Sequence, residues 1–81
     1  MDIKTELQDF ISERFKIIAS PLFIERALSS IREASLEKES LTVAASKVSK
    51  LVSLFIDTEL GKEIYDNLKA KIDMAFFLRK S

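Results

Sequence analysis

Cysteine and histidine are both missing from this 81-residue chain, and each absence excludes a class of chemistry. Without cysteine the chain has no disulfide framework, no thiolate metal site and no thiol nucleophile. Without histidine it lacks the usual general base, the common zinc or iron ligand and the side chain that titrates near neutral pH. The sequence also has no glycine-rich phosphate loop. We therefore expect a non-enzymatic protein that holds no cofactor and no metal.

Glycine and proline occur once each, as Gly61 and Pro21, which leaves the chain with few turn signals. No Asn-Gly or Asp-Gly pair is present to close a β-hairpin. Hydrophobic residues make up 47% of the chain and charged residues 32%, a balance that favours a packed core over disorder. The sequence predicts one all-α domain that spans residues 1–81.

Net charge is also absent, since thirteen basic residues balance thirteen acidic ones. A neutral chain is not drawn at long range to a polyanion or to an anionic membrane. The amino terminus lacks a signal-peptide core, and no apolar segment is long enough to cross a bilayer, so we expect a cytoplasmic protein. Scarce Asn, Gln and Gly beside abundant Lys and Glu suggest a thermophilic source.

Amphipathic periodicity is the strongest positive signal in the chain. At about 100° per residue, the apolar side chains gather on one face in four stretches. These stretches predict a small antiparallel bundle of three to four helices, at about residues 2–18, 21–36, 40–57 and 59–79. The apolar arcs of the first and third stretches include four residues near their ends that we expect to be buried, namely Ile17, Ile18, Phe55 and Ile56.

Capping residues mark where these helices begin. Asp2 and Ser20 are the predicted N-caps of the first two helices, and Ser40 is the candidate for the third. Asp57 or Thr58 is the expected N-cap of the fourth helix. Pro21 suits the first turn of the second helix and ends the first.

The third and fourth stretches have apolar faces that point in roughly opposite directions if helical phase continues between them. A break between residues 57 and 61 is therefore the better interpretation. The alternative is one continuous helix in an oligomer, with one face against its own chain and the other against a partner. Beside the apolar arc of the third stretch lies a band of small residues, Thr42, Ser46, Ser49 and Ser53, along which a neighbouring helix could approach closely.

Apolar residues off the main faces of the third and fourth stretches suggest an interface. They are Val43, Leu54, Ala70, Met74 and Phe77. Such a surplus suits a homodimer or a groove for another protein, particularly in a chain too short to build a large core alone. The leading hypothesis is a helical protein–protein interaction module, a small dimeric regulator or assembly factor.

The alternative hypothesis is a small nucleic-acid-binding regulator. It would use Lys47 and Lys50, on a stretch without acids between residues 41 and 56, together with Arg79 and Lys80 at the carboxyl end. The apolar run from Met74 to Leu78, followed by these two basic residues, also has the composition of a membrane-surface helix. We expect the run to be buried between helices instead. Arg14 falls inside the apolar arc of the first helix, where we expect it to reach the rim or to pair with a carboxylate across an interface.

Overall fold

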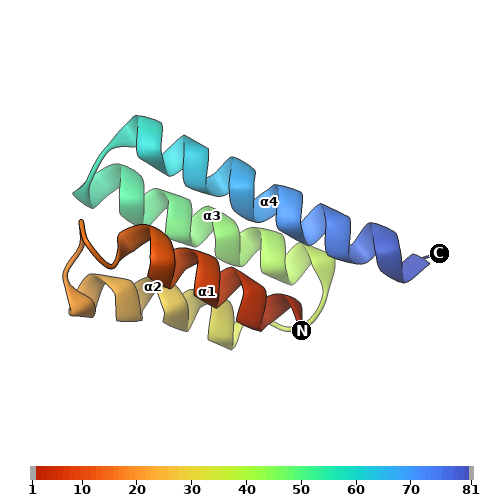
Figure 1. Cartoon of the computed structure of the whole chain (residues 1–81). Coiled ribbons are helices and arrows are strands. Elements are labelled where there is room, and N and C mark those ends of the chain that lie inside the picture. The colour runs from red at the N-terminus through yellow and green to blue at the C-terminus, as the bar shows by residue number, and fades with distance from the viewer. Residues whose placement is uncertain (1, 81) are drawn as a thin grey trace.

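The helices predicted from hydrophobic periodicity are present in the structure, a computed structural model that describes the backbone of residues 2–80 and the side chains of residues 2–78. Within this range the chain forms four helices, α1 (Ile3–Phe15), α2 (Pro21–Glu33), α3 (Lys38–Phe55) and α4 (Thr58–Lys80). Consecutive helices run in opposite directions (Figure 1). The predicted all-α antiparallel bundle is confirmed, and α3 and α4 are separate helices.

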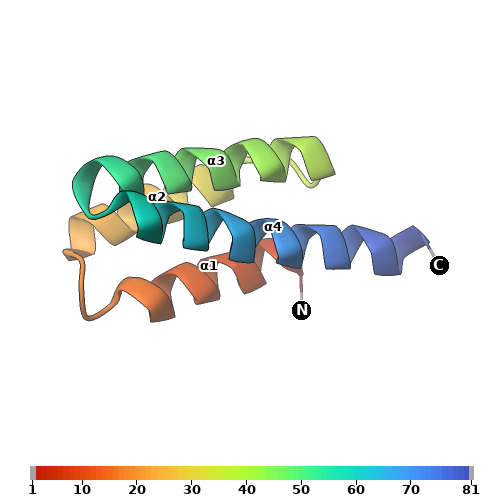
Figure 2. The same cartoon turned by 90° about the horizontal axis from the view of Figure 1, so that it is seen from above.

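The helices are arranged as a square in cross-section. α1 packs against α2 and α4, and α3 packs against the same two helices; within the described residues the diagonal pairs make no close backbone approach. The α1–α2 and α3–α4 connections lie together at one end of the bundle, which we call the loop end (Figure 2). The α2–α3 connection lies at the other end. There α4 continues well past its neighbours (Figures 1 and 2).

One continuous apolar core fills the space between the four helices. Each helix contributes its predicted apolar face, and among the described residues the buried side chains are all apolar: Ile3, Leu7, Ile11, Phe15, Ala27, Leu28, Ile31, Leu41, Ala44, Ala45, Val48, Val52, Ile64, Leu68 and Ile72. At the loop end the ring of Phe23 stacks edge-on against Phe15, with centroids 5.9 Å apart, and against Phe55, at 6.4 Å. Burial of these faces is the main source of stability.

Three of the predicted helix caps are confirmed. Asp2, Ser20 and Asp57 each accept a hydrogen bond from the backbone amide three residues on, at 3.1, 3.2 and 3.0 Å. The prediction for the third helix was wrong, because Glu37 occupies the N-cap position and makes no side-chain hydrogen bond there. Ser40 lies inside α3, where its hydroxyl accepts a hydrogen bond from the Ser35 amide at 2.9 Å.

Several predicted helix ends extend too far. α1 ends at Phe15 rather than at residue 18, and the amides of Ile18 and Ala19 both donate to the Phe15 carbonyl in a closing turn. α2 ends at Glu33 rather than at 36, since Ala34 has extended backbone angles. Residues 34–37 connect the two helices, and α3 begins two residues earlier than predicted, at Lys38. Periodicity continued past the real ends because the turn residues are themselves apolar.

The predicted burial of residues near these ends was therefore wrong. Ile17 and Ile18, past the end of α1, are 86% and 53% exposed. Phe55 and Ile56, at the end of α3, are 66% and 39% exposed. All four lie at the loop end, where the chain reverses and no further layer of helix covers them.

The tightest packing joins α3 to α4 along the predicted band of small residues. The Ser49 hydroxyl donates a hydrogen bond of 2.8 Å to the Gly61 carbonyl on the facing helix. A Cβ atom on Gly61 would lie 2.0 Å from the Ser53 hydroxyl oxygen and 2.9 Å from the Ser49 carbonyl oxygen. Gly61 is buried, and its amide donates within the first turn of α4, to the carbonyl of Asp57. The only glycine therefore permits close helix approach rather than a turn.

Candidate interaction surfaces

The far end of α4 projects beyond the rest of the bundle. Lys38, the first residue of α3, lies level with Asp73, and their side chains are 3.4 Å apart. On the other side Lys71 lies 3.6 Å from Glu6 in α1. α4 continues to Lys80, so about two turns of helix follow Asp73. These turns extend past the ends of both neighbouring helices (Figures 1 and 2).

Apolar side chains cover one side of this projecting helix. Met74, Phe77 and Leu78 are 59%, 70% and 63% exposed, and Ala70 is exposed one turn earlier. Their spacing places them on one side of α4, and we call these four residues the distal face. Phe76, by contrast, is half-buried and packs against the core. Open hollows border the distal face, one reaching across to Lys38 and one to Glu6.

Charged side chains hold the base of the projection. The Lys69 ammonium donates a hydrogen bond of 3.1 Å to Asp73, which also faces Lys38. The bond from Lys69 lowers the pKa of Asp73, and the same contact raises the pKa of Lys69. Lys71 also lies over the ring of Phe10, 5.3 Å from its centroid, in a cation–π contact. Both neighbours of α4 are thus tied to it between Ala70 and Met74, at the start of the distal face.

The predicted interface residues are only partly brought together. Ala70, Met74 and Phe77 share the distal face, as their spacing suggested. Val43 is 55% exposed on α3 but lines neither hollow beside the distal face. Leu54 is 79% exposed and lies in the last turn of α3, at the loop end. The five residues therefore do not form one continuous surface.

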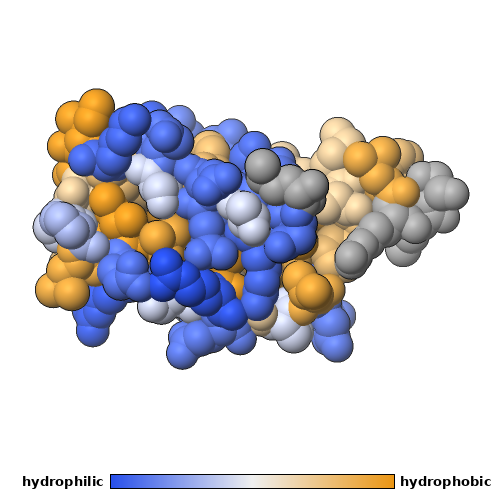
Figure 3. Space-filling view, turned by 60° about the horizontal axis from the view of Figure 1, so that its bottom comes forward, coloured by the Kyte–Doolittle hydropathy of each residue, from blue (hydrophilic) through white to orange (hydrophobic). Residues whose placement is uncertain are grey.

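A larger apolar surface, which the sequence analysis missed, lies at the loop end. It comprises six large side chains, and we call it the loop-end surface: Ile17, Ile18, Leu22, Leu54, Phe55 and Ile56. A hollow runs between the α1–α2 turn and the end of α3, lined by Ile18 and Phe55 among others. In Figure 3 the apolar colours gather at both ends of this side of the molecule, with mostly hydrophilic residues between them. The available sequence signal was that the apolar run Ile17-Ile18-Ala19 directly precedes Ser20-Pro21, where the first helix was predicted to end.

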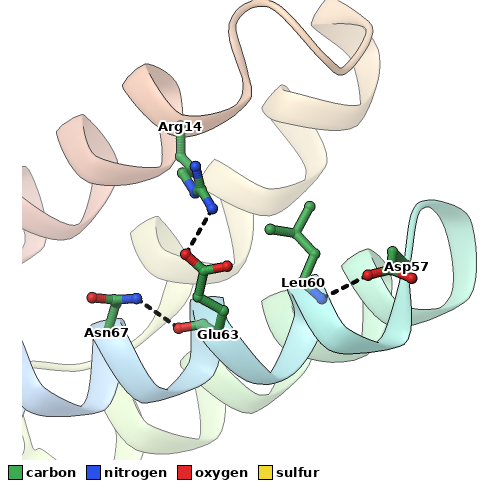
Figure 4. A network of polar contacts seen from close by, with 5 residues as sticks. All are labelled: Arg14, Asp57, Leu60, Glu63 and Asn67. Carbon is green, nitrogen blue, oxygen red and sulfur yellow. Dashed lines mark hydrogen bonds and ion pairs between the residues drawn. The ribbon is translucent and has the colours of Figure 1, made fainter.

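Arg14 reaches the rim of α1 and pairs within its own chain. Its guanidinium lies 2.7 Å from the carboxylate of Glu63 on α4, and the two side chains are 40% and 54% exposed. Figure 4 shows this pair beside Asn67, whose amide donates to the Glu63 carbonyl at 2.8 Å. The pair links α1 to α4, and no second chain is needed to satisfy Arg14.

The basic residues of the alternative hypothesis are spread along the bundle. Lys47 and Lys50 are exposed in the second half of α3, eight and five residues before its last residue, Phe55. Arg79 and Lys80 lie in the last turn of α4, and their side chains fall outside the described residues. Since Lys38 marks the level of Asp73, the α3 lysines and the end of α4 are separated by roughly 25 Å along the bundle axis. The fold does not gather them into one basic patch.

Among the described residues there is no group of three or more Asp and Glu side chains placed to hold a metal ion. No helix in the described part of the chain is both long enough and apolar enough to span a membrane. A scan against protein-family models, a search of curated proteins and a search of solved structures each gave no match.

Proposed function

We propose that the chain is a non-enzymatic, cytoplasmic protein–protein interaction module that self-associates, acting as a small regulator or assembly factor. The observation that carries the proposal is the projection of α4 past its neighbours with Met74, Phe77 and Leu78 more than half exposed. Isolated exposed apolar residues are ordinary, but contiguous ones mark binding surfaces. Exposure of the apolar side of a projecting helix to water is also unfavourable, and contact with a second protein surface removes that cost.

Chain size supports self-association. A domain of this length buries a comparatively small fraction of its apolar surface, and association adds the core that one copy lacks. With roughly 200 Å² for each large side chain, the three exposed residues of the distal face present about 400 Å². That area is too small for a tight complex by itself and fits a weak, concentration-dependent one.

Sedimentation velocity over a concentration series from about 5 µM to 1 mM tests the proposal. The weight-average mass of the wild-type chain should rise above the 9.2 kDa of one copy as concentration increases. Phe77→Glu should hold the mass at one copy, because a charge would be buried without a partner. Val43→Glu is the matched control, since it places the same charge on an exposed apolar site away from the distal face.

The alternative, a nucleic-acid-binding regulator that uses Lys47, Lys50, Arg79 and Lys80, is tested on the same preparations. Gel retardation of duplex DNA at low ionic strength should show no salt-dependent shift if the protein binds only protein. A wild-type chain that stays at 9.2 kDa up to 1 mM would refute self-association. A salt-dependent DNA shift that Lys47→Ala/Lys50→Ala removes would favour the alternative.

A further inference from the structure

We propose that the chain associates head to tail, with the distal face of one copy seated on the loop-end surface of the next. This inference rests on the proposed self-association and specifies its geometry. The two surfaces lie at opposite ends of a molecule whose longest dimension is 38 Å. A contact between them covers one surface of each kind, and a copy with a neighbour at each end has both of its exposed apolar surfaces covered.

Area favours this pairing over a symmetric contact between two distal faces. The six side chains of the loop-end surface are between 39% and 86% exposed, which corresponds to roughly 800 Å² of surface at about 200 Å² per free side chain. Together with the distal face they provide up to about 1,200 Å², above the ~1,000 Å² expected of a specific interface. Two distal faces alone provide about 800 Å² and leave both loop ends uncovered.

The shapes of the two surfaces also favour head-to-tail contact. The distal face is carried by a helix that projects from the bundle, whereas the loop end is hollowed between the α1–α2 turn and the end of α3. Ile18, Phe23 and Phe55 line that hollow, which is about 290 Å³ in volume. A projecting side chain such as Phe77 would seat there. Contact between two loop ends would place hollow against hollow.

The charges around the two surfaces also favour head-to-tail contact over either symmetric contact. At the start of α4, next to the loop-end surface, Asp57, Glu59 and Asp66 outnumber Lys62, while Glu63 is paired with Arg14. Around the distal face Lys38, Lys69 and Lys71 outnumber Glu6 and Asp73, and the sequence continues with two more basic residues. Head-to-tail contact brings opposite signs together, whereas either symmetric contact brings like signs together.

A head-to-tail interface has a distinctive consequence for assembly. Because the two surfaces face away from each other, each added copy leaves one end of each kind exposed, and the assembly stays open. The mass should therefore increase with concentration without a plateau at two copies.

Complementation between two variants tests the geometry. Phe77→Glu alters the distal face only, and I17E/L22E alters the loop-end surface only. All three sites are at least 70% exposed, and α2 has no acid in its first turn, so Leu22→Glu also suits the helix dipole. Circular dichroism of each variant should match that of the wild type.

Each variant alone should associate at least about 30-fold more weakly than the wild type, the loss expected for an interface centre. An equimolar mixture should form a species of two copies and no larger one, because only one intact pair of surfaces remains. Association of I17E/L22E alone at wild-type strength would show a symmetric distal contact and overturn the head-to-tail geometry while leaving self-association intact. So would a mixture that stays at one copy. A wild-type chain that never associates would refute the proposed function itself.

Discussion

Replacement of Gly61 by alanine tests the close packing of α3 against α4. In an exposed helix, Gly→Ala stabilises by about 0.8–1.0 kcal/mol because alanine loses less backbone entropy on folding. At Gly61 the added methyl would lie 2.0 Å from the Ser53 hydroxyl oxygen, which can rotate away, and 2.9 Å from the Ser49 carbonyl oxygen, which cannot. The two helices must then move apart by a few tenths of an ångström.

Overpacking of this kind costs about 1–3 kcal/mol, which equals or exceeds the gain in helix propensity. We expect a net loss of up to about 2 kcal/mol in the free energy of unfolding, and a fall in Tm of roughly 4–8 °C for each kcal/mol. Urea and thermal unfolding followed by circular dichroism at 222 nm measure both quantities. The experiment belongs at low protein concentration, so that association does not contribute.

A second substitution identifies the cause of the loss. Ser53→Ala removes the nearest atom. The cost of Gly61→Ala should therefore be smaller in that background than in the wild type, by at least about 0.5 kcal/mol. Lys62→Ala, at the exposed neighbouring position, is the control and should change stability by less than about 0.5 kcal/mol. If Gly61→Ala instead stabilises the chain by about 1 kcal/mol in both backgrounds, the close approach of α3 and α4 is wrong.

The remaining predictions concern caps, surface charge and heat. Ser20→Ala should lower the free energy of unfolding by about 0.5–2 kcal/mol, with Ser20→Gly costing only a few tenths, in urea titrations. A double-mutant cycle on Arg14 and Glu63 should give a coupling of no more than about 1 kcal/mol that shrinks in high salt, since both side chains are partly exposed; a much larger coupling would contradict that exposure. Asp2 and Asp73 have pKa values lowered by hydrogen bonds to their carboxylates, so the stability that they add is present above the unfolded pKa of about 4 and is lost as pH falls below it. The urea midpoint of unfolding should therefore decrease as pH falls below about 4, and the decrease should be smaller for Asp73→Asn than for the wild type. A Tm above about 60 °C is expected if the composition reflects a thermophilic source, and a scan that melts below that temperature would rule the source out.

The sequence alone was sufficient to predict the fold class and most of the core. Helical periodicity depends only on which residues are apolar and how they are spaced, so the buried faces of all four helices could be read from it. Caps such as Ser20 and Asp57 were predictable for the same reason, because a cap is a contact between residues three positions apart. The small-residue band on α3 correctly indicated where a second helix would approach.

Tertiary structure decided what happens at the ends of the helices. Periodicity reports direction around a helix axis, but burial also needs a neighbour at the same level along that axis. Ile17 and Phe55 have the correct phase and remain exposed, because the bundle stops where the chain turns. Phe77 is exposed because it lies on the part of α4 that projects past its neighbours, and that projection exists only because α4 is longer than they are. The role of Gly61 likewise depends on a contact with Ser53, since only the packed pair of helices places those two residues together.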